Sequence, residues 1–413
     1  MRRHSRAWRK ASWMLSPSWT TISPAWDVNA IESSNKVSIC FIRFLFCINI
    51  RRSMMLFVIS RNSDKKDCFS SKSKYLVTMK MNMKQWVADV IRQKEVAAVP
   101  VMTHPGIELN GRTVRQAVSD GRVHYEAVMT LVRKYPSAAA CTIMDLTTEA
   151  EAFGAEVAFS DEAVPAVSSR LLPDVESIYK LQVPSLSAAR IPQYLKANLL
   201  AAREVNDRPL LAGCIGPFSL AGRLYDMSEI MVLIYEHPEA AHELLRKCTD
   251  FIEKYCLALR ETGANGVMMA EPAAGLMSND DCKEFSSKYV KRIVERVQNE
   301  NFIVVLHNCG NTGHCTDAMV ATGAAAYHFG NKCRMEEVIR EVPPTALAMG
   351  NVDPVSVFKD GMPSQVRETV LNLLEKVRDY PNFVLSSGCD TPPHTPQHNV
   401  DVFFDALDEW NKQ

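Results

Sequence analysis

Short apolar runs alternate with longer amphipathic stretches along the chain from Met83 onward. The runs are continuous, rich in β-branched residues and bounded by Gly, Asn or Pro, which is typical of strands buried on both faces of a parallel sheet. Eight strands are expected, at Val96–Met102, Ala138–Ile143, Pro209–Ile215, Gly266–Ala270, Phe302–Leu306, Ala324–Phe329, Ala346–Met349 and Phe383–Leu385. Apolar residues at helical spacing predict helices at Lys84–Lys94, His124–Tyr135, Ile191–Asn206, Pro238–Thr262, Asp280–Asn299, Thr316–Thr322, Met335–Glu341, Ser364–Arg378 and Pro396–Glu409.

The repeated strand–helix units indicate an α/β fold with a parallel sheet. Roughly eight units in about 300 residues favour a single (β/α)₈ TIM barrel over a doubly wound sheet. No G-x-G-x-x-G follows the first strand and the sequence contains no P-loop, so the usual nucleotide-binding motifs are absent. In such a barrel the active site lies at the carboxyl ends of the strands.

Residues 1–78 differ in composition from the rest of the chain. They hold four of the six tryptophans, many Ser and Arg residues, and no regular period of hydrophobicity. The apolar run 37–50 is interrupted by Arg43 and is too short to span a bilayer. A mitochondrial-type presequence is one interpretation. We favour translation called from an upstream start, with the true start at Met79, Met81 or Met83, so that residues 79–413 form the barrel and a chain beginning at Met83 keeps its fold.

Charge and cysteine content restrict the class of protein. The chain has 47 basic and 47 acidic residues, but residues 1–80 take 15 basic and 4 acidic ones, which leaves 32 basic and 43 acidic residues for 81–413. An acidic body makes nucleic acid an unsuitable partner. The twelve cysteines show no regular spacing and no C-x-x-C, which indicates reduced thiols in a cytoplasmic protein. We expect no membrane association, and an oligomer is compatible with the sequence.

Two of the expected strands end in residues that bind soft metals. His307 and Cys309 follow the run Phe302–Leu306, and Cys389 follows Phe383–Leu385. Residues two apart on a strand face the same way, so His307 and Cys309 can hold one ion together. One His and two Cys form a three-ligand Zn²⁺ set with an open fourth position, which is a catalytic pattern. The alternative is a core histidine with buried cysteines.

Other polar residues fall at strand ends. Glu271 closes an otherwise apolar strand, where a carboxylate is costly unless it is used or paired. We therefore expect Glu271 to be catalytic, with a salt bridge at the barrel mouth as the alternative. We assign substrate contacts to four further residues, with turn hydrogen bonds, solvated loops or packing as their alternatives: Asp145, His328, Asn351 and Asp390.

Four motifs carry a family resemblance. They are G-P-F-S-L-A at 216–221, H-N-C-G-N-T at 307–312, G-N-V-D-P at 350–354 and S-G-C-D-T-P-P at 387–393. From about Met83 to Trp410 the chain resembles the uroporphyrinogen decarboxylase superfamily, and most of all its methylcobamide:thiol (coenzyme M) methyltransferase branch. The resemblance implies a (β/α)₈ barrel, zinc ligands at His307, Cys309 and Cys389, and methyl transfer between a corrinoid on a partner protein and a small molecule such as a thiol.

Two departures from the family patterns bear on function. The decarboxylase motif R-Q-A-G-R corresponds here only to Arg115-Gln116-Ala117-Val118-Ser119, which lacks the glycine and the second arginine. Where some thiol methyltransferases have a carboxylate, this chain has Phe329-Gly330-Asn331-Lys332, so a fourth zinc ligand would be water, Glu271 or the substrate thiol. The rival functions are a porphyrinogen decarboxylase and a non-catalytic corrinoid-binding barrel. The sequence leaves open the direction of transfer, the methyl donor and the acceptor.

Overall fold

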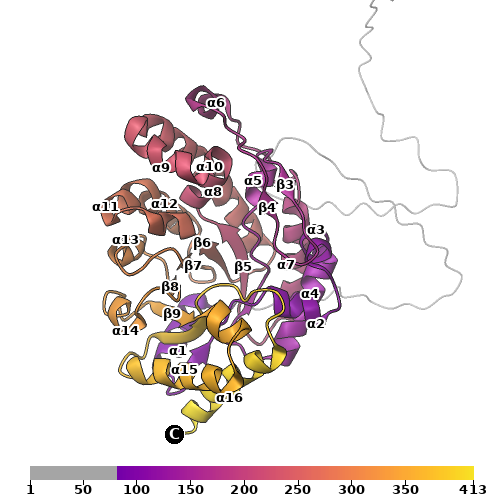
Figure 1. Cartoon of the computed structure of the whole chain (residues 1–413), viewed down its shortest axis with the longest axis vertical. Helices are drawn as coiled ribbons and strands as arrows, with labels where there is room; N and C mark the ends of the chain where they lie inside the picture. Colours follow the sequence, from indigo (N-terminus) through magenta and orange to yellow (C-terminus); the bar gives the residue numbers. More distant parts are fainter. Residues whose placement is uncertain (1–80) are drawn as a thin grey trace, which may run out of the picture. The chain divides into compact units, whose positions relative to one another are not determined.

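The protein is described here from a computed structural model, which describes residues 81–413 (Figure 1). The expectation that residues 1–78 are an extension or an upstream translation start lies outside the described residues. The first helix, α1 (Met83–Arg92), begins at an Asn82 cap whose side chain accepts a hydrogen bond from the Gln85 amide. The expected start of the first helix is therefore correct to within one residue.

Eight parallel strands form one sheet, in the order β1-β10-β9-β8-β7-β6-β5-β2. All eight correspond to expected strands, and the (β/α)₈ barrel is confirmed. The Ala138 amide donates to the Ala98 carbonyl at 2.8 Å, which joins the two edge strands and closes the ring. The strands are β1 (Ala97–Ala98), β2 (Ala140–Cys141), β5 (Leu210–Ile215), β6 (Gly266–Ala270), β7 (Ile303–Asn308), β8 (Ala326–Phe329), β9 (Leu347–Val352) and β10 (Phe383–Ser387).

Helices surround the strands, and Figure 1 shows this most clearly around β5 to β9. Most of them match the expected periodic segments. The surrounding helices are α4 (Gly121–Lys134), α7 (Ile191–Glu204), α10 (Pro238–Glu261), α11 (Asn279–Cys282), α12 (Lys288–Val297), α13 (Thr316–Val320), α14 (Met335–Val338), α15 (Pro363–Lys376) and α16 (Gln397–Asn411). Among residues 81–413, no helix combines the length and the apolar character needed to cross a bilayer.

The sequence patterns missed several short elements. One is an antiparallel hairpin, and the others are helices that follow strands or connect the longer helices. They are α2 (His104–Leu109), α3 (Val114–Ser119), α5 (Thr148–Ala152), β3 (Val157–Ala158), β4 (Ala166–Val167), α6 (Val175–Lys180), α8 (Pro217–Tyr225) and α9 (Met227–Glu236).

The barrel interior is filled by alternate residues of the strands. Val305, Ala326 and Val384 belong to one buried cluster, which also includes Met83 and Val87 of α1. Helix α1 therefore packs against the interior residues from the end opposite the carboxyl ends of the strands. Side chains on a strand repeat every two residues, so the next inward positions along these three strands are His307, His328 and Ser386. The interior thus changes from apolar to polar at the carboxyl ends.

Candidate metal centre

The structure brings together the three residues that the sequence nominated as metal ligands. The ligand atoms of His307, Cys309 and Cys389 all lie within 4.8 Å of one another. His307 Nε2 is 3.7 Å from Cys389 Sγ. Two such atoms bound tetrahedrally to one zinc ion, at about 2.0 and 2.3 Å, would be roughly 3.6 Å apart. The donor set is therefore one that zinc uses, and the spacing between His307 and Cys389 matches a tetrahedral zinc site.

Glycines allow the loops that carry the two cysteines to pack closely. A Cβ on Gly330 would lie 2.6 Å from the Cys309 Cα, and a Cβ on Gly388 would lie 2.5 Å from the Asn331 amide nitrogen. Neither distance leaves room for a side chain. The loop after β8 thus lies against both cysteine-bearing loops.

The three candidate ligands differ in exposure. His307 is buried at 1% exposure, whereas Cys309 and Cys389 are partly exposed. One side of the set is therefore closed by the barrel interior, whereas the two cysteine residues lie partly at the surface. This is the arrangement that a catalytic site with an open coordination position requires.

The two thiols have unlike acidities when no metal ion is present. Hydrogen bonding from the Cys389 thiol lowers the pKa of Cys309, and the positive charge of Lys332 acts in the same direction. The same bond, together with burial, raises the pKa of Cys389. A dication bound to both sulfurs would remove both protons.

His328 lies beside His307 on the neighbouring strand. The parallel register pairs the two residues, and their Nδ1 atoms are 2.7 Å apart. The other ring nitrogen of His328, Nε2, is 2.8 Å from Ser386 Oγ. Burial at 0% exposure lowers the pKa of His328 well below its usual value. His328 therefore lies behind a candidate ligand, away from the open side where we expected a substrate contact.

Glu271 is bound to a helix end. One carboxylate oxygen accepts from the Phe218 amide at 2.7 Å and from Ser286 Oγ at 2.9 Å, and the other accepts from the Ser219 amide at 2.9 Å. These contacts cap the N-terminus of α8. Burial raises the pKa of Glu271, and the three hydrogen bonds oppose that effect. Glu271 is not in the group of clustered metal-binding side chains among the described residues, so the structure gives no support to Glu271 as a fourth ligand.

Asp145 is enclosed in a buried network. Its carboxylate is paired with Arg190 and accepts from Tyr194 Oη at 3.0 Å and Thr147 Oγ1 at 2.7 Å. The side chain of Asp145 is completely buried. These contacts occupy the groups that would otherwise be offered to a substrate.

The remaining two expected substrate contacts connect loops at the barrel mouth. Asn351 Nδ2 donates to the carbonyl oxygens of Gly330 at 2.9 Å and Cys333 at 2.8 Å, which holds the loop after β8. Asp390 accepts from the Thr103 amide at 2.7 Å, which ties the loop of Cys389 to the segment after β1. Burial raises the pKa of Asp390. In both residues the side chain supports the loops around the candidate metal ligands.

The model of one protein family matches nearly the whole described part of the chain. The family is described as uroporphyrinogen decarboxylase (URO-D), and the match covers residues 83–410. The chain belongs to the uroporphyrinogen decarboxylase family.

Relatives in this family include two kinds of enzyme. The methylcobamide:CoM methyltransferase MtbA of Methanosarcina acetivorans is 30% identical over 260 residues, covering 62% of this chain and 75% of its own length. A uroporphyrinogen decarboxylase of Legionella pneumophila is 26% identical over 295 residues, covering 70% and 83%. A solved structure of a methyltransferase from Methanosarcina mazei has a TM-score of 0.72 at 23% identity, covers 80% of this chain and 99% of its own, and shares the fold.

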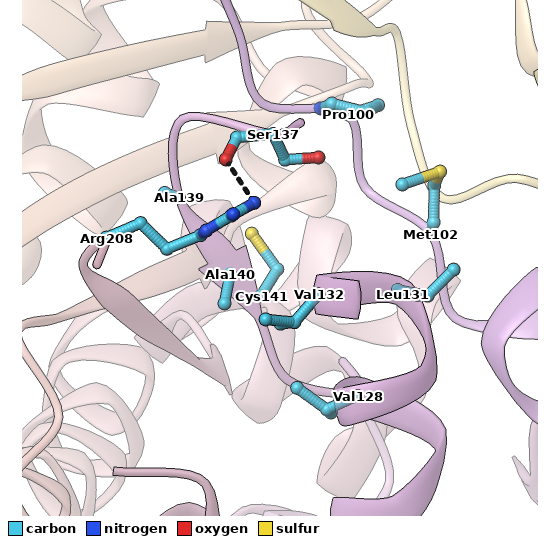
Figure 2. Close-up of a pocket in the computed structure, with 10 residues that line it drawn as sticks. All are labelled: Pro100, Met102, Val128, Leu131, Val132, Ser137, Ala139, Ala140, Cys141 and Arg208. Atoms are coloured by element: carbon cyan, nitrogen blue, oxygen red, sulfur yellow. Dashed lines mark hydrogen bonds between the residues drawn. The ribbon is translucent and has the colours of Figure 1, made fainter. Parts of the chain in front are cut away.

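Two cavities in the described part of the protein lie away from His307, Cys309 and Cys389. A cavity of about 20 Å³, room for roughly one water, lies beside β1 and β2. Figure 2 shows Arg208 reaching the Ser137 carbonyl, at 2.8 Å, with the Cys141 thiol close by. A groove of about 990 Å³ runs beside α1, near the amino ends of β7 to β9. The chemistry-bearing residues instead meet at the carboxyl ends of the strands.

Sequence reasoning missed two residues that contribute to this centre. Ser386 lies just beyond the expected strand Phe383–Leu385, yet its position two residues after the inward-facing Val384 places it in the same interior layer as His307. Lys332 was noted only as a departure from the family pattern, yet its charge acts on Cys309. The alternation along β10 was the signal that could have identified Ser386.

Proposed function

We propose that this protein is a zinc-dependent methyltransferase that moves a methyl group between a corrinoid on a partner protein and a small thiol such as coenzyme M. The observation that carries the proposal is the set of His307, Cys309 and Cys389, which converges at the barrel mouth with its sulfur side accessible. The similarity to methylcobamide:CoM methyltransferases of Methanosarcina supports the choice of donor and acceptor.

His307, Cys309 and Cys389 would hold the zinc ion. When bound there, the ion would supply Lewis acidity that keeps a substrate thiol in its nucleophilic thiolate form at neutral pH. Two thiolates and one neutral imidazole balance the charge of a dication, so an added thiolate stays electron-rich. The partly exposed cysteines leave the approach from solvent open, while the buried His307 closes the interior side.

The chain offers little support for the decarboxylase alternative. Arg115, in the segment that partly resembles the decarboxylase motif, lies on α3 and donates to the Phe159 carbonyl and to Asp161. Arg190, which does lie among buried groups, is already paired with Asp145 and Glu151. A substrate with several carboxylates needs several available cations. Arg115 and Arg190 are thus already engaged with protein groups.

The proposed compartment is the cytoplasm. All nine cysteines within the described residues are free thiols, as expected in a reducing environment. Zinc–thiolate chemistry also depends on reduced cysteines.

Methyl transfer from methylcobalamin to coenzyme M, followed by the change in corrinoid absorbance, tests the proposal. Wild-type protein should catalyse it, and Cys389→Ala should lose at least about 10²-fold in rate, because a metal ion contributes several kcal/mol to such a step. Cys333→Ser is the matched control, since Cys333 lies near the site but donates to the Asn311 carbonyl. Decarboxylation of uroporphyrinogen without methyl transfer, or an unimpaired Cys389→Ala variant, would contradict the proposal.

A further inference from the structure

Four buried groups form a hydrogen-bonded series that begins at the Val99 carbonyl, just after β1, and ends at the candidate ligand His307. Ser386 Oγ lies 2.7 Å from the Val99 carbonyl oxygen and 2.8 Å from His328 Nε2. His328 Nδ1 lies 2.7 Å from His307 Nδ1. His328 and Ser386 are each 0% exposed, and His307 is 1% exposed. Water therefore does not compete for these hydrogen bonds, and each hydrogen bond in the series has one defined donor and one defined acceptor.

The direction of every hydrogen bond follows from the first. A carbonyl oxygen only accepts, so the Ser386 hydroxyl donates its single hydrogen to Val99. Toward His328 the same oxygen can then only accept, so His328 Nε2 carries a hydrogen. No carboxylate among the described residues is hydrogen-bonded to His328, and a charged imidazolium without one is costly at complete burial. His328 is therefore neutral, and its Nδ1 is an acceptor.

The proton between the two rings then belongs to His307. Because His328 Nδ1 accepts, His307 Nδ1 carries the hydrogen and donates it. A neutral His307 is left with a free lone pair on Nε2, the atom that faces Cys389 Sγ at 3.7 Å. The opposite tautomer would place a hydrogen where the metal ion is proposed to bind.

We infer that His328 is a positioning residue that, together with Ser386, holds the proton of His307 on Nδ1 and so keeps His307 Nε2 available for a metal ion. The inference rests on the metal site of the proposed function. It assigns to His328 a role different from the substrate contact expected from its place at a strand end. Partners of this kind commonly contribute 10- to 100-fold to metal affinity.

Four substitutions separate this role from general packing. His328→Leu removes the acceptor, whereas His328→Asn retains one, since its Oδ1 occupies about the place of the ring Nδ1. Ser386→Ala removes the hydroxyl group that determines which atom donates in each hydrogen bond of the series. Ser387→Ala is the matched control, because within residues 81–413 Ser387 Oγ bonds only to the Val101 amide and carbonyl.

Two measurements report on these variants. Chelator competition gives the zinc dissociation constant. This constant should rise about 10- to 100-fold in His328→Leu and by a smaller factor in Ser386→Ala. It should stay within a few-fold of the wild-type value in His328→Asn and Ser387→Ala. Long-range ¹H–¹⁵N spectra of histidine-labelled, metal-free protein identify which ring nitrogen of His307 carries the proton, with His307→Gln providing the assignment. Wild type should show the proton on Nδ1, and His328→Leu should lose that preference.

The results distinguish this inference from the proposed function. A wild-type protein without zinc would overturn the metal site, while the spectra of metal-free protein would still decide the tautomer. A His328→Leu variant that folds, as judged by circular dichroism, and keeps both the wild-type zinc affinity and the proton on Nδ1 would overturn the inference. If His328→Leu does not fold, Ser386→Ala decides by the same two readouts.

Discussion

Replacing Glu271 by Gln tests whether this carboxylate is a helix cap. The structure gives Glu271 three donors: the Phe218 amide, the Ser219 amide and the Ser286 hydroxyl. Glutamine has the same size but offers only one acceptor oxygen. That oxygen can serve two of the donors, and its amide NH₂ group then faces the third, a buried N–H.

The magnitude follows from that mismatch. Leaving one buried donor unsatisfied costs about 1–3 kcal/mol, and replacing charge-assisted hydrogen bonds at a helix N-terminus by neutral ones adds about 1 kcal/mol. We therefore expect Glu271→Gln to lower the free energy of unfolding by about 2–4 kcal/mol. Zinc content should not change, because Glu271 is not among the clustered metal-binding groups of the described residues.

Urea unfolding followed by circular dichroism measures the first quantity, and elemental analysis of the folded protein measures the second. Glu149→Gln is the matched comparison, since Glu149 is equally buried but has one carboxylate oxygen without a hydrogen-bond partner among the described residues. It should not lower the free energy of unfolding, and at high pH it should raise it, because burial raises the pKa of Glu149. Loss of zinc together with unchanged stability in Glu271→Gln would refute the reasoning and restore Glu271 as a ligand.

Three further substitutions test the electrostatics and packing around the mouth. Burial raises the pKa of Glu149 from 4.5 to about 7, so the stabilising contribution of Glu149 is complete below pH 4.5 and is lost as the pH rises through 7. Glu149→Gln should remove this loss and be more stable than wild type at pH 8 by up to about 3 kcal/mol in urea unfolding. A variant with the same dependence of stability on pH as wild type would contradict this prediction. Arg190→Met leaves the buried Asp145 without its ion pair and should cost about 3 kcal/mol or more by the same assay, so a loss below about 1 kcal/mol would argue against the pairing. Gly330→Ala would bring a methyl group to 2.6 Å from the Cys309 Cα and should weaken zinc binding in chelator competition, whereas wild-type affinity would show that the loop yields freely.

Hydrophobic periodicity was enough to predict the barrel because each strand lies within a short, mostly apolar run that alternates with an amphipathic stretch. The eight runs fall on the eight strands, and β6 (Gly266–Ala270) has the predicted bounds. The first strand is shorter than predicted, because the ladder ends near Val99 and the Val101 amide turns to Ser387 Oγ. Such side-chain competition for backbone donors does not show in a hydrophobic pattern.

The site was only partly predictable for a related reason. A strand end identifies residues near the mouth, so His307, Cys309 and Cys389 could be grouped from the sequence. What each neighbour contacts depends on register and on short helices. Helix α8 was missed because Gly216-Pro217, just after the expected strand Pro209–Ile215, marks only the boundary of that strand in the hydrophobic pattern, although Pro at the first turn is a helix-start signal. Without α8, the capping role of Glu271 could not be inferred.

The zinc content of the purified, reduced protein tests the central claim most directly. Elemental analysis should find a single zinc ion per chain in the wild type and in Cys333→Ser, and almost none in Cys389→Ala, because Cys389 completes the set with His307 and Cys309. A wild-type protein without zinc, or a Cys389→Ala variant that retains its zinc in full, would contradict the account.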